Sequence, residues 1–98
     1  MWWVYLLRCA DGTLYAGATN DLDRRLAAHN AGRGAKYTRA RRPCALVYRE
    51  AAADKSAALR REAALKKLPR VAKLRLIEMA REKGYNKEET EKEAAIRG

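Results

Sequence analysis

The stretch from Asp21 to His29 places two polar side chains beside the apolar side of a predicted helix. At about 100° per residue, Leu22 and Leu26 define the buried side. Arg25 and His29 fall within about one side-chain width of that side, and their i, i+4 spacing lets them point together at a sheet. Arginine binds phosphate and histidine carries a proton near neutral pH, but each alone also fits a surface cation or a structural histidine.

A carboxylate falls near the middle of the apolar side of a second predicted helix, which ends near Leu68. Burying an unpaired carboxylate costs several kcal/mol or forces it to take up a proton. We therefore expect a cation, a metal ion or hydrogen-bond donors next to it, and on pattern alone an ion pair with an arginine is as good an explanation as a metal site. The carboxylate is Glu62, and its apolar neighbours on the helical wheel are Ala58, Leu59 and Leu65.

Two tyrosines lie in strand-like segments that a turn signal connects. Tyr5 belongs to the aromatic, β-favouring stretch 2–9, and Tyr15 belongs to the run TLYAGA that follows. Because side chains alternate across a strand, the two tyrosines share one face of a hairpin only if the turn has an odd number of residues. A three-residue loop at 10–12, with Gly12 in the left-handed conformation, meets this condition, whereas a two-residue turn would separate them. Ordinary sheet packing explains either tyrosine alone.

Cap and stop residues set the boundaries of the elements that must position these side chains. Asn20 is the N-cap candidate of the first helix and Gly32 is its stop. Either Asp54 or Ser56 can cap the second helix. A third strand is expected at 45–50.

A final helix begins at Pro69, which breaks the helix before it, and ends at Gly84. Its apolar positions Val71, Leu74 and Ile77 fit one buried stripe. The resulting order ββαβαα predicts an α/β (α+β) fold with a small three-stranded, mainly antiparallel sheet and flanking helices. We expect one domain over residues 1–84, followed by a charged C-terminal tail or frayed helix over 85–98.

The chain has 98 residues and a formal net charge of +10, and 19 of its 22 Lys and Arg lie within residues 1–84. A basic surface of this size indicates nucleic acid, through phosphate neutralisation and counterion release, although acidic lipid or acidic protein would satisfy the same charge. The apolar run 1–7 is too short for a membrane helix, and Cys9 and Cys44 form no CxxC pair. We therefore expect a cytoplasmic protein with reduced thiols and no membrane association.

The order and spacing of these residues resemble the GIY-YIG nuclease superfamily. The resemblance spans roughly residues 2 to 80 and is greatest to the small stand-alone bacterial members, the UPF0213 group. The segments HNAG and GAKYTRARRP also resemble Slx1-type structure-selective nucleases. The motifs are Val4-Tyr5-Leu6, Tyr15-Ala16-Gly17, then DLDRRLAAHNAG with Arg25 ten residues after the second tyrosine, and Glu62 on a later helix.

The resemblance implies a metal-dependent endonuclease that hydrolyses phosphodiester bonds in DNA. Glu62 would be the metal ligand and would hold one divalent cation, Mg²⁺ or Mn²⁺, together with phosphate and water oxygens. Tyr5, or Tyr15 hydrogen-bonded to it, would position and deprotonate the attacking water. Arg25 and His29 would contact the scissile phosphate.

A polar, basic loop precedes the third strand and mixes cations with an aromatic ring on which a base could stack. DNA is the expected partner in preference to RNA, and a protein partner could supply specificity. The alternatives are a catalytically weak or inactive nucleic-acid-binding module and an interaction protein that docks an acidic partner. The residues expected to contact nucleic acid are Arg33, Lys36, Tyr37, Arg39, Arg41, Arg42 and, on the second helix, Lys66.

Overall fold

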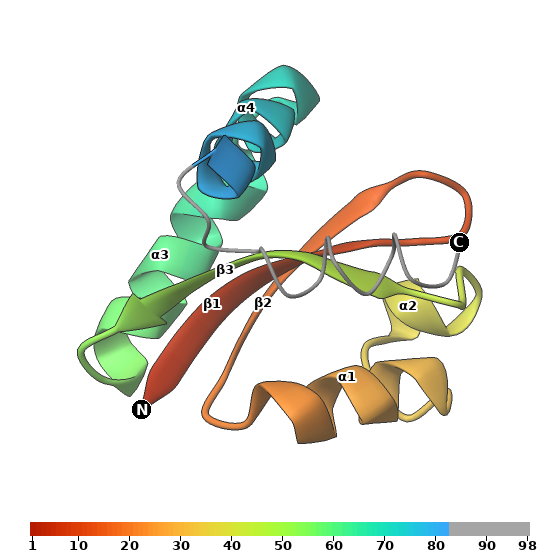
Figure 1. Ribbon diagram of the computed structural model, residues 1–98. Coiled ribbons are helices and arrows are strands. Elements are labelled where there is room, and N and C mark those ends of the chain that lie inside the picture. Colours follow the sequence, from red (N-terminus) through yellow and green to blue (C-terminus); the bar gives the residue numbers. More distant parts are fainter. Residues whose placement is uncertain (83–98) are drawn as a thin grey trace.

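Three antiparallel strands form one sheet with the order β2-β1-β3 in the computed structural model, which describes residues 1–82 (Figure 1). This arrangement confirms the predicted α+β fold. The predicted tail at 85–98 lies outside the described residues. The strands are β1 (Trp2–Arg8), β2 (Leu14–Thr19) and β3 (Ala45–Ala52), and the helices are α1 (Leu22–Asn30), α2 (Lys36–Arg39), α3 (Lys55–Lys67) and α4 (Arg70–Glu82).

The β1–β2 hairpin has the predicted three-residue loop. The backbone N–H of Cys9 donates to the carbonyl of Thr13 at 2.9 Å, and Gly12 between them has a left-handed φ of +85°. In this register Tyr15 lies opposite Leu7, two residues along β1 from Tyr5. Tyr5 and Tyr15 therefore share one face of the sheet, as the odd loop length requires.

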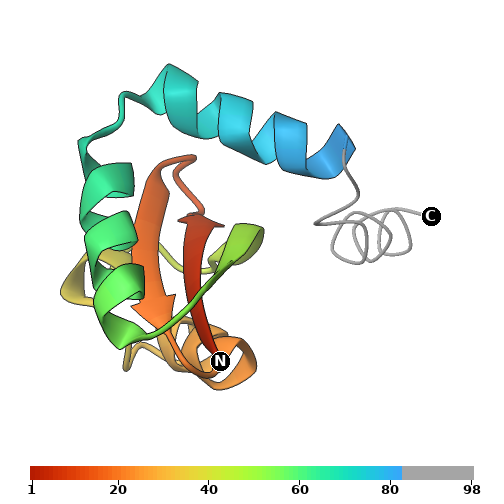
Figure 2. The same cartoon turned by 90° about the vertical axis from the view of Figure 1, so that its left-hand side faces the viewer.

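The two faces of the sheet are covered by different helices (Figures 1 and 2). Because β1 is the central strand and its side chains alternate, it supplies buried residues to both faces. One cluster packs beneath α3 and α4, and it contains Val4, Leu6, Ala16, Val47, Tyr48, Ala58, Leu65, Ile77 and Ala80. The other packs against α1, and it contains Tyr5, Leu7, Cys9 and Cys44, with Tyr15, Leu22, Leu26 and Leu46 around them.

Side-chain hydrogen bonds to backbone N–H groups correct one predicted helix cap and decide another. Asp21, and not Asn20, caps α1, because its carboxylate accepts from the backbone N–H of Arg24 at 3.1 Å. Of the two candidates for α3, Asp54 is the cap. The basic loop before β3 also contains one helical turn, α2, which the sequence did not predict.

The predicted stripe on the last helix is wrong. Ile77 is buried, but Val71 is 66% exposed and Leu74 is 43% exposed. Ala80 and the half-buried Leu76 pack with Ile77 instead, so α4 meets the sheet mainly through its C-terminal half. No helix within the described residues is long and apolar enough to cross a membrane.

Candidate active site

His29 lies at the centre of a short chain of hydrogen bonds on the α1 face of the sheet. Its ring is fully buried, with Nε2 3.0 Å from the Tyr5 hydroxyl and Nδ1 2.7 Å from the Thr38 hydroxyl. The Thr38 hydroxyl donates to the backbone carbonyl of Ala35 at 2.9 Å, so it is an acceptor towards His29. This pattern assigns the imidazole proton to Nδ1 and leaves Nε2 to accept the proton of Tyr5.

Arg25 reaches the same tyrosine from the preceding turn of α1. Its side chain is hydrogen-bonded to Tyr5, and because a guanidinium can only donate, the phenol oxygen accepts this bond. Burial raises the pKa of Tyr5, and the Arg25 hydrogen bond opposes part of that rise. Burial, followed by the positive charge of Arg25, lowers the pKa of His29. Tyr5 therefore rests as a phenol between a guanidinium and a neutral imidazole.

Burial bears on the predicted roles of both His29 and Tyr5. His29 has no exposed surface and Tyr5 is 2% exposed, so neither side chain is open to a ligand in this structure, and the contact of His29 with the scissile phosphate stays a prediction. Arg25, by contrast, is exposed at the site.

Two glycines permit this close packing. Gly17 pairs with Tyr5 across the hairpin, and a Cβ at Gly17 would lie under 3.0 Å from the phenol oxygen. A Cβ at Gly34 would meet the imidazole of His29 in the same way. Contacts this short do not occur for real side chains, so the glycine of the second triplet and Gly34 are required by the positions of the Tyr5 and His29 rings.

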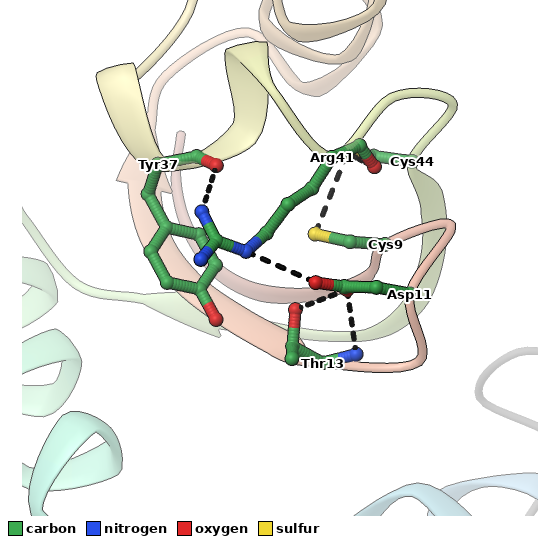
Figure 3. A network of polar contacts seen from close by, with 6 residues as sticks. All are labelled: Cys9, Asp11, Thr13, Tyr37, Arg41 and Cys44. Carbon is green, nitrogen blue, oxygen red and sulfur yellow. Dashed lines mark hydrogen bonds and ion pairs between the residues drawn. The ribbon is translucent and has the colours of Figure 1, made fainter.

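Tyr15 stands beside these groups in a column of rings and cations. Its ring lies edge-on to His29 at 5.4 Å between centroids and stacks with the Tyr37 ring at 5.8 Å. The Arg41 guanidinium covers Tyr37 at 3.9 Å from the ring centroid (Figure 3). Tyr37 therefore already stacks with two protein groups, which compete with the nucleobase expected to stack there.

Arg41 is itself fixed in position by the hairpin turn (Figure 3). Its Nε donates to the Asp11 carboxylate at 3.1 Å, and its Nη1 donates to the backbone carbonyl of Tyr37 at 2.9 Å. Thr13 also donates to Asp11, from both its hydroxyl and its backbone N–H. These bonds hold the α2 turn against the β1–β2 hairpin and thereby order Tyr37 and Tyr15.

Glu62 approaches the site from α3, which runs along β2. Its side chain is 18% exposed, and its carboxylate lies 2.9 Å from the Lys66 ammonium, which raises the pKa of Lys66. The predicted partner thus exists, but it is a lysine one turn away and not an arginine. Of the three residues predicted to form the apolar side around Glu62, Ala58 and Leu65 are fully buried. The prediction is wrong for Leu59, which is 47% exposed.

Glu62 and Lys66 face the tyrosines. The Glu62 carboxylate lies close enough to Tyr5 to raise its pKa, and the Lys66 ammonium lies 5.9 Å from the centroid of the Tyr15 ring. The five predicted site residues are therefore neighbours: Tyr5, His29 and Arg25 share hydrogen bonds. Tyr15 packs on His29, and Glu62 faces them from α3.

The protein supplies only part of the ligand set that a divalent cation would need at this site. No group of three or more potential ligands among His, Cys, Asp and Glu occurs within residues 1–82. A single carboxylate is nevertheless a suitable donor for a hard cation that takes its other oxygens from phosphate and water. Glu62 is the residue that would hold such an ion, in competition with Lys66.

The basic loop divides into bound and exposed cations. Besides Arg41, the Arg42 side chain is bound, since its Nε donates to the carbonyl of Arg39 at 2.9 Å. The side chains of Arg33, Lys36 and Arg39 are exposed. The bound arginines shape the loop; Arg42 is also exposed, and it stays a predicted nucleic-acid contact together with the three exposed cations.

Sequence reasoning missed Thr38, Gly34 and Asn30. Thr38 is fully buried because it binds His29, yet its segment reads as a solvated loop. Asn30 fixes the end of α1 by donating to the Cys44 carbonyl at 3.0 Å and accepting from the Cys44 N–H at 2.7 Å. In the sequence, all three residues are visible only as small or amide residues close to His29. That pattern alone does not show which groups they contact.

Comparison with known proteins assigns the family. A model described as the GIY-YIG catalytic domain matches residues 1–75. A UPF0213 protein of Bacillus pumilus is 53% identical over 89 residues, covering 90% of this chain and 91% of that protein. A UPF0213 protein of Lactiplantibacillus plantarum is 55% identical over 78 residues, covering 78% and 77%.

A solved structure supports the same conclusion. The solution NMR structure of a UPF0213 protein from Bacillus halodurans is 45% identical, with a TM-score of 0.52, and covers 81% of this chain and 85% of that chain. GIY-YIG domains form a nuclease superfamily, whereas these relatives carry only the UPF0213 name. The match along the sequence and the shared fold show that this chain belongs to the GIY-YIG family, in its UPF0213 group.

Proposed function

We propose that this protein is a metal-dependent endonuclease that hydrolyses phosphodiester bonds in DNA. The observation that carries the proposal is the Tyr5 hydroxyl, which is held between the Arg25 guanidinium and the Nε2 acceptor of a neutral, buried His29. Tyr5 is 2% exposed, so a phenol so placed can take a proton from water only if water reaches its oxygen and its own proton has an acceptor. His29 supplies that acceptor.

Proton transfer then runs through the chain's own residues. Tyr5 takes a proton from the attacking water as its hydroxyl proton moves to Nε2 of His29, while the other imidazole proton stays on Nδ1, donated to the Thr38 hydroxyl oxygen. Because the two transfers are coupled, no free phenolate has to form in a site where burial raises the pKa of Tyr5. Tyr15, packed on His29, keeps the imidazole in position.

Positive charge at the site would offset the charge that develops on the phosphate. Arg25 can donate to a phosphate oxygen with the guanidinium protons that Tyr5 does not use. A divalent cation, Mg²⁺ or Mn²⁺, would be held by Glu62 and would supply Lewis-acid stabilisation when bound. Lys66, released from Glu62, would be free to contact the strand.

The test is cleavage of a panel of duplex, single-stranded, flap and four-way-junction DNAs with Mg²⁺ or Mn²⁺. Glu62→Gln keeps the shape of the side chain but removes the charge, so we expect cleavage to fall by at least about a hundredfold while DNA binding remains. The matched control is Glu78→Gln on the exposed surface of α4, which should cut like the unsubstituted protein. Cleavage that survives Glu62→Gln would contradict the proposal.

The second candidate is a nucleic-acid-binding module without turnover. The Glu62–Lys66 ion pair favours it, because an ammonium at 2.9 Å already neutralises the only acidic side chain proposed as a metal ligand. Tight binding to the same DNA panel without metal-dependent cuts in the unsubstituted protein would select this candidate over the enzyme.

A further inference from the structure

An open pocket of about 650 Å³ lies along one side of α1. Arg24 and Arg25 line it from the helix, Arg33 lines it from the segment after the helix, and residues 19–21 close it where β2 leads into α1. Ala28 is the only apolar side chain in this lining. The pocket is thus built for an anion, and it offers no ring on which a base could stack.

Two of the three arginines are available to a ligand. Within residues 1–82, the side chains of Arg24 and Arg33 have no ion-pair partner, whereas Arg41 and Arg61 are paired with carboxylates. The one carboxylate in the lining, Asp21, accepts the backbone N–H of Arg24 as the helix cap. Three guanidinium groups against one committed carboxylate leave a net positive pocket, and such a site attracts phosphate.

Arg25 belongs to both this pocket and the candidate active site. It lines the pocket with Arg24 and Arg33, and its side chain is also hydrogen-bonded to Tyr5. A strand whose scissile phosphate lies at Tyr5 can therefore place its neighbouring backbone in the pocket. A volume of about 650 Å³ exceeds what one phosphate needs and suits a sugar-phosphate segment.

We propose that Arg24 and Arg33 bind backbone phosphates of the nucleic-acid strand next to the scissile phosphate. This inference rests on the proposed nuclease function for the position of the scissile phosphate. Because the pocket lacks an aromatic or apolar platform, it reads charge and not base identity. Arg24 was not among the predicted site residues, because its helical position points away from the buried side of α1. The proposal adds it to the site.

The test measures the dissociation constant of a fluorescein-labelled single-stranded DNA, with mixed sequence or with thymine only. All measurements use the Glu62→Gln background without divalent cations, so cleavage plays no part. The pocket variant is Arg24→Ala with Arg33→Ala. The control is Arg70→Ala with Arg75→Ala on α4, which removes the same charge from two exposed positions on the other face of the sheet.

We expect the pocket variant to bind at least about tenfold more weakly than the control for both DNA sequences. For the pocket variant, the slope of log Kd against log salt should be smaller by about 1.4 than for the protein with both arginines. Each phosphate contact on a single strand contributes about 0.7, and the variant loses two. Equal losses in the pocket and control variants, or a loss confined to one DNA sequence, would overturn the proposal. Unchanged circular dichroism melting is expected for both variants, because all four side chains are exposed.

The outcome is separable from the nuclease proposal. If the unsubstituted protein cuts no DNA and the pocket variant still loses binding more than the control, the nuclease function fails and the phosphate pocket stands. If the protein cuts DNA but the pocket and control variants bind alike, the enzyme stands and the pocket proposal fails.

Discussion

The tautomer of His29 determines whether the Tyr5 hydroxyl has a proton acceptor. With Nδ1–H bound to Thr38, the other ring nitrogen is a permanent acceptor for the Tyr5 hydroxyl. With the opposite tautomer, Nε2–H would donate to Tyr5 and no group would accept the phenol proton. Thr38, which carries no reacting atom, is therefore a positioning residue for the proposed reaction.

Thr38→Val tests this arrangement because valine keeps the shape and removes the hydroxyl. We expect the free energy of unfolding to fall by about 1–3 kcal/mol, since the buried Nδ1–H loses its acceptor. Cleavage by the folded protein should fall at least about tenfold in kcat, with little change in KM. Thr38→Ser restores the hydroxyl and should recover most of kcat; failure of serine to rescue would count against the tautomer assignment.

His29 also makes stability depend on pH in a predictable direction. Its pKa in the folded protein lies below the ordinary value of 6.5, so as the pH falls below about 6.5 the unfolded chain takes up a proton that the folded chain does not. The free energy of unfolding should therefore decrease as the pH falls from about 6.5 towards the folded pKa, and it should be insensitive to His29 above 6.5.

The chain contains a single histidine, so this pH window can be assigned to one residue. Urea unfolding between pH 5 and 7 would measure the change, and NMR titration of the one imidazole would give the folded pKa. His29→Gln should be less stable at pH 7 but should lose the slope near pH 6. A folded imidazole that titrates above 6.5 would contradict the expected direction.

At the scale of elements, local sequence patterns predicted those features whose causes are local. Strand alternation and the left-handed Gly12 determined the hairpin register, and Pro69 separated α3 from α4. The stripe on α4 failed because a spacing of three residues drifts by about 60° per step around a helix, so Val71 lies about 120° around the axis from the buried Ile77. A strict period of three residues does not stay on one side of a helix that has about 3.6 residues per turn.

In the candidate site, too, the features with local causes were predicted and those that depend on packing were not. Each of the five predicted residues follows from helix or strand periodicity together with the family spacing. Their partners Thr38, Arg41 and Lys66 could not be derived, because each contact depends on how α2 and α3 pack against the hairpin. Burial of His29 likewise depends on Gly34, a residue that carries no periodic signal.

Gly17→Ala tests the close approach of β2 to the Tyr5 ring. The added methyl group would overlap the phenol oxygen, so we expect a destabilisation of about 1–3 kcal/mol and a large loss of cleavage as Tyr5 leaves its position. Gly12→Ala is the control, since it has open space but strains a left-handed φ, and should destabilise by about 1 kcal/mol without changing kcat. Equal kcat values for the two variants would refute a positioning role for Gly17.

For the molecule as a whole, the site depends on both layers that flank the sheet. Tyr5, Arg25 and His29 belong to the α1 face, whereas Glu62 is carried by α3, whose buried residues join the opposite cluster. Strand β1 connects the two clusters because its alternate side chains enter each of them. The layers should consequently unfold together, as small single domains usually do.

Two adjacent tryptophans allow this coupling to be measured from each face. Trp2 packs against the α3 and α4 cluster, and Trp3, one residue along β1, points to the other face. Trp3→Phe leaves Trp2 as the reporter, and Trp2→Phe leaves Trp3. In each background Leu65→Ala should lower the free energy of unfolding by about 2–5 kcal/mol, because Leu65 is fully buried.

We expect both tryptophans to report the same loss in urea unfolding, although Leu65 lies on the Trp2 face only. The control is Leu59→Ala on the same helix, which is 47% exposed and should cost under about 1 kcal/mol. A smaller loss or a separate transition seen by Trp3 would mean that the α1 layer folds independently. In that case, damage to α3 would remove Glu62 from the site while leaving Tyr5 and His29 in place.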